Sequence, residues 1–145
     1  MLFQRLNRSD PEKVFIVVKN SYSTAAITVG QAVAWDYTTD ADGVGVTQPT
    51  TALITMPCGI VEYASIAAGD YGLVQVYGHN ANALVDGTTG VGVGTRLRLT
   101  NASFALSHMT TALDTFGTAC SFTFVSGQVY TTGAAAAKKC FIRAL

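Results

Sequence analysis

Short runs of β-branched and aromatic residues, separated by Gly, Asn, Asp and Pro, recur along the whole chain. Val, Ile, Tyr and Phe fit the pleated, half-buried surface of a sheet, whereas Gly, Asn, Asp and Pro favour turns. The pattern is therefore typical of an all-β domain with frequent turns. The runs that predict strands are 14–19, 32–37, 60–63, 73–77, 95–100, 120–124 and 139–145.

The order of side chains within these runs predicts how each strand is covered. In 96–99 arginines alternate with leucines, so one side of this strand faces solvent, because successive strand side chains point to opposite faces. The runs 15–18 and 73–77 are apolar at nearly every position, which predicts strands that lie between two packed layers or in a closed barrel. Only residues 107–113 could form a short turn of helix.

Glycine-started segments repeat in a way that suggests an approximate internal duplication, with copies at about 30–78 and 94–145. Each copy has a strand, a long loop, a strand that follows Gly, a tight turn and an apolar closing strand. Neither half could bury its apolar face alone, so the two would pair in one barrel or sandwich. The identity between the halves is low, and chance spacing remains the alternative. We expect residues 14–145 to form a single compact β-barrel or sandwich-like domain of β-tulip or jelly-roll type.

The length and composition favour one domain that works in contact with other proteins. A chain of 145 residues can build one hydrophobic core. Charged residues make up 12% of the chain, compared with about 25% in typical soluble proteins, and the formal net charge is zero. Few charges and no net charge leave a surface poorly protected against association.

Charge is unevenly distributed along the chain. Residues 1–19 carry four basic and two acidic side chains, 20–95 carry six acidic and no Lys or Arg, and 96–145 carry five basic and one acidic. Opposite patches of this kind orient subunits during association, but chance clustering on an ordinary soluble surface is the favoured interpretation of the pattern. We expect no nucleic-acid partner, because the chain lacks a dense basic stripe.

The apolar stretch 14–18 is too short for a signal-peptide core or a membrane span, so we expect synthesis in the cytoplasm and no membrane partner. The three cysteines are odd in number, widely spaced and without a C-x-x-C pair. We therefore expect buried free thiols rather than disulfides or a zinc site. They are Cys58, Cys120 and Cys140.

Residues 1–13 form an amphipathic lead-in, which we expect to be an N-terminal arm. The tetrad 9–12 can be read as a helix-capping box, but the β-branched residues that follow favour a turn into a strand. Terminal segments are loose unless docked, so the arm either orders against a partner, by adding a strand or filling a groove, or folds back on its own domain. The residues expected to contact a partner are Leu2, Phe3, Leu6, Arg5 and Arg8.

Few residues offer catalytic chemistry. His79 is expected in a turn after a strand, and His108 follows Ser107 without the G-x-S-x-G context of a hydrolase. The acidic run 36–43 lacks the further ligands of a calcium loop and predicts a polar hairpin tip. The glycines of 90–94 precede a strand rather than a helix, so a linker is favoured over a phosphate loop. We expect no enzyme, no cofactor, no metal and no small-molecule substrate.

Exposed aromatic side chains leave one alternative, a glycan- or receptor-binding β-module on a virion or cell surface. Such modules use Trp and Tyr as stacking platforms. The same residues would serve equally well in a core or an interface. The candidates are Trp35, Tyr37, Tyr63 and Tyr77.

The glycine-punctuated segments 59–61, 68–78, 116–119 and 139–145 resemble the small head decoration, or cement, proteins of tailed bacteriophages. The likeness covers about residues 30–145. It implies a virion structural protein on the outside of the phage head, a homotrimer that bridges major capsid protein subunits and stabilises the capsid. The loops 47–55 and 131–137 and the arm have no counterpart in the resemblance, which leaves the docking site open.

Overall fold

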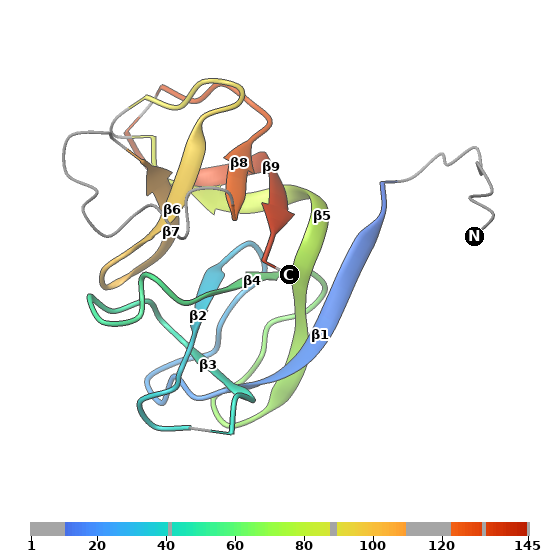
Figure 1. Cartoon of the computed structure of the whole chain (residues 1–145), viewed down its shortest axis with the longest axis vertical. Coiled ribbons are helices and arrows are strands. Elements are labelled where there is room, and N and C mark those ends of the chain that lie inside the picture. Colours follow the sequence, from blue (N-terminus) through green and yellow to red (C-terminus); the bar gives the residue numbers. More distant parts are fainter. Residues whose placement is uncertain (1–10, 41, 88–89, 110–122, 132, 145) are drawn as a thin grey trace.

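The computed structural model describes residues 11–40, 42–87, 90–109, 123–131 and 133–144, and these residues form an all-β structure (Figure 1). The predicted fold class is confirmed. The described residues contain no helix, and hence none that is long and apolar enough to span a membrane. The strands are β1 (Lys13–Asn20), β2 (Ala32–Trp35), β3 (Gly45–Thr47), β4 (Pro57–Val61), β5 (Tyr71–Val85), β6 (Arg96–Thr100), β7 (Ser103–His108), β8 (Phe124–Ser126) and β9 (Ala136–Arg143).

Hydrogen bonding arranges these strands in two rings that share the long strand β5. In the first ring β1 pairs with β3, β3 with β2, β2 with β4, β4 with β5, and β5 closes the ring on β1. In the second ring β5 pairs with β7, β7 with β6, β6 with β8, β8 with β9, and β9 closes on β5. Figure 1 shows β5 running from the group of β1–β4 to the group of β6–β9.

The two rings repeat the same pairing pattern. β1–β3 and β5–β7 are parallel, and the remaining pairs in both rings are antiparallel. The first half of β5 pairs with β1, from Gly78 opposite Lys13 to Tyr71 opposite Lys19. Its second half pairs with β9 in the same sense, so β1 of the first ring corresponds to the second half of β5. The glycine spacing predicted that the first copy begins at about residue 30. In the structure the first copy begins earlier, at β1.

Individual backbone hydrogen bonds also recur between the rings. The N–H of Gly30 donates to the carbonyl of Val61 at 2.8 Å, and the N–H of Gly94 donates to the carbonyl of Ser126 at 2.8 Å. Gly30 and Gly94 have φ values of +87° and +81°, in the left-handed region that glycine adopts without a steric cost. Two isolated bridges complete the repeat, Ile27–Ile66 and Val91–Tyr130.

Two hydrophobic clusters hold the rings together. The first cluster lies in the first ring and includes Val18, Val33 and Val74. The second cluster combines residues of the second ring with Ala32, Ala34 and Ile60 from β2 and β4. Because strand side chains alternate, β2 sends Val33 to one cluster and its two alanines to the other. The second ring therefore covers the β2–β4 side of the first ring.

Several strand boundaries differ from those predicted. β2 ends at Trp35 because the Asp36 carboxylate accepts hydrogen bonds from the hydroxyl of Thr38 and the N–H of Thr39, which hold a turn. β5 continues to Val85, so His79 lies within a strand and the prediction of a turn there is wrong. Gly78, next to His79, has a φ of +103°, but it lies within the strand and does not form the predicted turn.

The predicted helical turn over 107–113 is also wrong where it can be checked. Ser107 and His108 belong to β7, which pairs with β6. β3 and β7 were not predicted, because each is too short or too polar to give a strong alternating pattern. The predicted strand 120–124 is described only from residue 123, and β8 begins at Phe124.

Candidate functional site

The two histidines do not form a catalytic group with their neighbours in the described residues. His79 lies on β5 and His108 at the end of β7. The hydroxyl of Ser107 accepts a hydrogen bond from Thr100 at 2.9 Å and donates to Asp86 at 3.4 Å, while His108, next along the strand, points to the other face. Among the described residues no three His, Cys, Asp or Glu side chains converge as metal ligands.

The described cysteines are buried free thiols. Burial raises the pKa of the Cys58 thiol. Burial, and secondarily the negative charge of Glu62, raises the pKa of Cys140 to about 12. A protonated thiol is a weak nucleophile and a poor metal ligand, so these two side chains act as small apolar core residues. Cys120 lies outside the described residues.

A buried polar network, which the sequence reasoning missed, joins the start of β1 to the middle of β5. Lys13 forms an ion pair with Glu62, whose side chain is only 8% exposed. The Asn80 amide donates to Glu62 at 2.5 Å and to the side-chain oxygen of Gln75 at 3.0 Å. Gln75 and Asn80 are fully buried, and polar residues within the apolar run of β5 were the signal that could have revealed them. The network fixes the point at which the chain enters β1.

The outer side of the β1–β5 pair carries an apolar surface that the rest of the described chain leaves open. We call it the β1–β5 face, and define it by Phe15, Val17, Tyr63, Tyr71 and Leu73. Val17 lies opposite Leu73 across the ladder, and these two side chains are 63% and 41% exposed. Tyr63 and Tyr71 are also exposed. Of the two alternatives predicted for 15–18 and 73–77, these strands lie in a closed ring rather than between two packed layers, and their outer side is open among the described residues.

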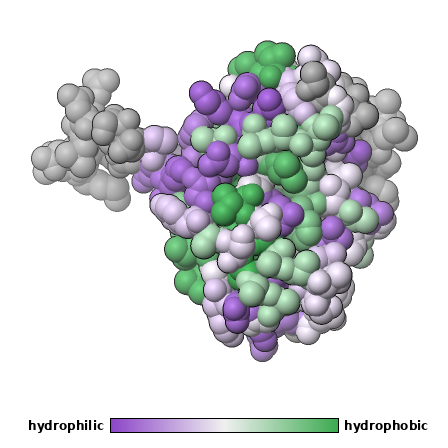
Figure 2. Space-filling model, turned by 180° about the vertical axis from the view of Figure 1, so that it is seen from behind, coloured by the Kyte–Doolittle hydropathy of each residue, from purple (hydrophilic) through white to green (hydrophobic). Residues whose placement is uncertain are grey.

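The inner side of the same strands is buried as expected. Val18 and Val74 belong to the first core cluster, and Ile16 packs against it. The strands β1 and β5 thus carry apolar side chains on both faces, and the described chain covers only the inner face. Figure 2 shows that hydrophobic residues on the back of the molecule form separate patches among polar ones rather than one continuous surface.

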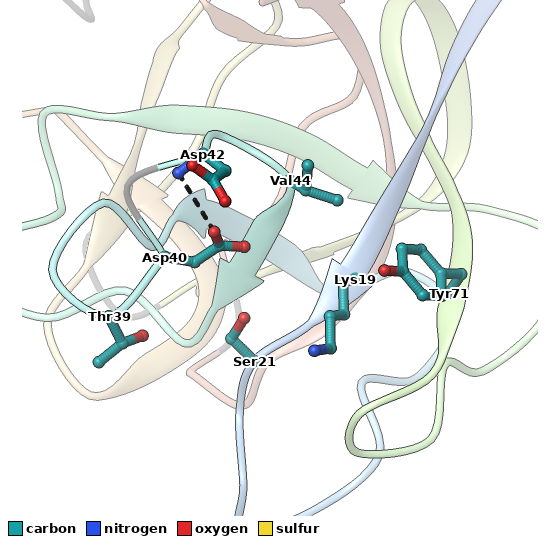
Figure 3. Close-up of a pocket in the computed structure, with 7 residues that line it drawn as sticks. All are labelled: Lys19, Ser21, Thr39, Asp40, Asp42, Val44 and Tyr71. Atoms are coloured by element: carbon teal, nitrogen blue, oxygen red, sulfur yellow. Dashed lines mark hydrogen bonds between the residues drawn. The ribbon is translucent and has the colours of Figure 1, made fainter.

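A hollow of about 360 Å³ lies at one end of the β1–β5 face (Figure 3). Tyr71 and Lys19 line it from β5 and β1, and Asp40 and Asp42 line it from the loop between β2 and β3. β2 and β3 pair antiparallel, so the loop between them is the tip of a hairpin, as predicted. The Asp42 N–H donates to the Asp40 carboxylate at 3.2 Å. Two carboxylates against one ammonium group give this end a net negative charge.

A second hollow, of about 470 Å³, lies where the chain enters β1. Its lining includes Pro11, Phe15, Tyr63 and His79. The rings of Phe15 and Tyr63 are 4.9 Å apart between centroids. The β1–β5 face thus has an acidic hollow near Lys19 and an aromatic hollow near Pro11.

The second ring differs at the positions that correspond to this face. Phe15 lies opposite Gln75 in the first ring, and His79 lies opposite Phe141 in the second. Lys139 occupies the place that corresponds to Leu73, since Cys140 and Val74 are the adjacent buried residues of the two closing strands. The pairing geometry therefore does not require apolar side chains on the outer side.

The predicted aromatic platform is not assembled on one exposed surface. Trp35 packs against the first core cluster. The Tyr37 hydroxyl donates to the carbonyl of Ala52 at 3.2 Å, while Tyr77 packs edge-to-face with Phe141 at 5.5 Å. Only Tyr63 of the four belongs to the β1–β5 face.

The predicted partner-contact residues Leu2, Phe3, Leu6, Arg5 and Arg8 lie outside the described residues. The described chain begins at Pro11, which borders the aromatic hollow. No known protein-family model and no curated protein matches this sequence.

Proposed function

We propose that this protein is a non-enzymatic structural protein of a virion, which binds the outside of a tailed-phage head as an oligomer and stabilises it by bridging major capsid protein subunits. The observation that supports this most directly is the β1–β5 face, an apolar outer surface that the chain itself leaves open. Its paired positions Val17 and Leu73 are exposed. The resemblance of the glycine-punctuated segments to head decoration proteins supplies the kind of assembly.

At the place that corresponds to Leu73 the second ring carries Lys139, so an apolar side chain is not required there by the strand pairing. Val17 and Leu73 lie opposite each other across the ladder and are both exposed, and adjoining exposed apolar side chains mark sites of interaction with other proteins or with ligands. A low charge content and zero net charge fit a domain that remains in contact with neighbours.

Binding to an assembled lattice accounts for the stabilising role. A protein that binds the assembled head and not its free subunits shifts the equilibrium toward the assembled state by mass action. An oligomer that contacts several subunits at once gains avidity, because every contact after the first is intramolecular. No reactive group is needed for either effect.

The proposal is tested with expanded heads purified without their decoration protein. Light scattering after size exclusion gives the oligomeric state of the protein, and co-sedimentation with a density map of the particles gives occupancy. Binding at regular lattice positions, with a higher temperature of head disassembly, is the expected result. A monomer that ignores heads but is retained on a glycan column would instead favour the glycan-binding alternative.

A further inference from the structure

We propose that the β1–β5 face is the docking site for residues 2–8 of a second copy of this chain. The proposal extends the proposed function, since it names the contact that holds the copies in one oligomer. Leu2, Leu6 and Arg8 lie on one side of an extended segment. The two leucines would cover the β1–β5 face, and Arg8 would lie at its acidic end.

The β1–β5 face needs a cover that the described chain does not supply. The opposite side of the first ring is covered by the second ring, through Ala32, Ala34 and Ile60. Val17 and Leu73 remain exposed, although the corresponding surface of the second ring carries Lys139. An apolar side chain that the pairing does not require is consistent with a surface that contacts another protein.

One edge of β1 is also open among the described residues. Among the described residues Lys13 to Val18 pair with β5 alone, and β3 joins β1 only at Lys19 and Asn20. A strand with one free edge presents unpaired N–H and C=O groups that an extended segment can pair with. The open edge and the apolar face lie on the same strand, so one extended segment can use both.

The segment 2–8 and the acidic end of the β1–β5 face carry opposite charges. Residues 2–8 contain Arg5 and Arg8 and no acidic side chain. The hollow near Lys19 contains Asp40 and Asp42, and residues 20–95 contain no Lys or Arg. Complementary charges of this kind set the orientation and register of a bound segment.

Distance requires that the segment at the acidic hollow come from a second copy. Pro11 and Lys19 are separated by eight residues, about 26 Å in an extended strand. Arg8 precedes Pro11 by three residues, so its backbone reaches about 11 Å at most. An arginine side chain does not bridge the remaining distance. The Arg8 side chain of the same chain therefore cannot reach the acidic hollow.

Arg5 of the same chain is excluded by distance as well. It precedes Pro11 by six residues, and the backbone must reverse direction to run back along β1. A reversal takes about two of these residues and leaves about 14 Å of reach, well short of the about 26 Å between Pro11 and Lys19. A neighbouring copy has no such restriction. If each copy gives its segment to the next, the contact is heterologous and closes into a ring under rotational symmetry.

A mixing experiment with two variants tests the proposal. The first variant lacks residues 2–8 and keeps the face. The second carries Val17→Asn and Leu73→Lys, which bring the polar character of the second ring to the face, and keeps the segment. Each variant alone is expected to be monomeric by light scattering, whereas an equimolar mixture forms a heterodimer through one segment and one face. Val93→Asn, at a residue that is 69% exposed in the second ring, is the matched control and should self-associate like the unaltered chain.

A charge exchange gives an independent readout. Arg8→Glu and Asp42→Arg should each weaken self-association by about tenfold or more, and the double variant should recover it. Thermal melting of every variant shows whether it folds. The proposal is overturned if the unaltered chain is monomeric, if either parent variant self-associates like the unaltered chain, if the mixture stays monomeric, or if the charge exchange does not restore association.

Head binding, measured on the same proteins, separates the two proposals. Monomers that still coat heads would overturn the docking of the segment and leave the capsid role standing. An oligomer that behaves as described but ignores heads would support the docking and overturn the capsid role.

Discussion

Phe15 and His79 occupy corresponding places in the two rings: Phe15 lies opposite Gln75 across β1 and β5, and His79 lies opposite Phe141 across β5 and β9. One position is aromatic and apolar and the other is titratable, although the strands around them pair alike. Both side chains border the aromatic hollow at the start of β1, and the strand pairing itself tolerates either kind of residue.

The same substitution should have different effects on stability at a buried position of β2 and at an exposed position of β1. Val33 is fully buried and Val17 is 63% exposed. Val33→Ala is expected to lower the free energy of unfolding by about 2 kcal/mol, because it leaves a cavity in the first core. Val17→Ala is expected to change it by no more than about 0.5 kcal/mol. Denaturant unfolding of the chain without residues 2–8 checks this; equal losses would show that Val17 is a core residue.

Gly30 and Gly94 provide a matched pair for backbone strain and packing. Both have positive φ, but a Cβ on Gly30 would lie 2.3 Å from the carbonyl oxygen of Asn82, whereas a Cβ on Gly94 meets nothing within 4 Å. Gly94→Ala should cost about 1–2 kcal/mol from the left-handed conformation alone. Gly30→Ala should cost about 3 kcal/mol or more, since a backbone clash is added. Thermal unfolding of both variants measures the difference, and equal shifts would contradict the close approach of residue 30 to β5.

The buried polar network should be sensitive to removal of its central carboxylate. Glu62→Ala leaves Lys13 without its ion-pair partner and removes an acceptor of Asn80. Unpaired buried groups carry their full desolvation cost, so we expect a loss of about 2–4 kcal/mol in the free energy of unfolding. Asp42→Ala, at an exposed carboxylate, is the control and should be nearly neutral when both variants are measured in the chain without residues 2–8, in which self-association does not contribute to stability. If Glu62→Ala left the free energy of unfolding unchanged, the network would contribute nothing to stability.

The buried thiols should make the fold less stable in alkali. Their pKa values are raised in the folded state, that of Cys140 to about 12, whereas an unfolded thiol ionises near pH 8.5. Between these values the unfolded chain loses protons that the folded chain keeps, so the free energy of unfolding falls as pH rises. Unfolding measured from pH 8 to 11 should show a steeper fall than in the double variant Cys58→Ala and Cys140→Ala. Parallel curves would argue against the buried thiols as the cause.

Local sequence patterns were sufficient for the class of the fold but not for its closure. The β-branched runs correctly placed β1, β6 and most of β9, because alternation and turn residues act over a few neighbours. They failed at β5, where His79 and Asn80 continue the strand. Pairing with β9 holds these polar residues in extended form, and a partner strand more than fifty residues away leaves no local signal.

The candidate site was predictable only in its ingredients. An apolar arm, an acidic middle region and doubly apolar strands could all be read from the residues. Val17 and Val33 look alike in such a reading, because each lies in an apolar run whose side chains alternate between two sides. The sequence by itself determined that both sides of these strands are apolar. Only the tertiary structure decided which side is covered, because the second ring packs on β2 and β4 and leaves β1 and β5 open, and such burial depends on contacts between distant segments.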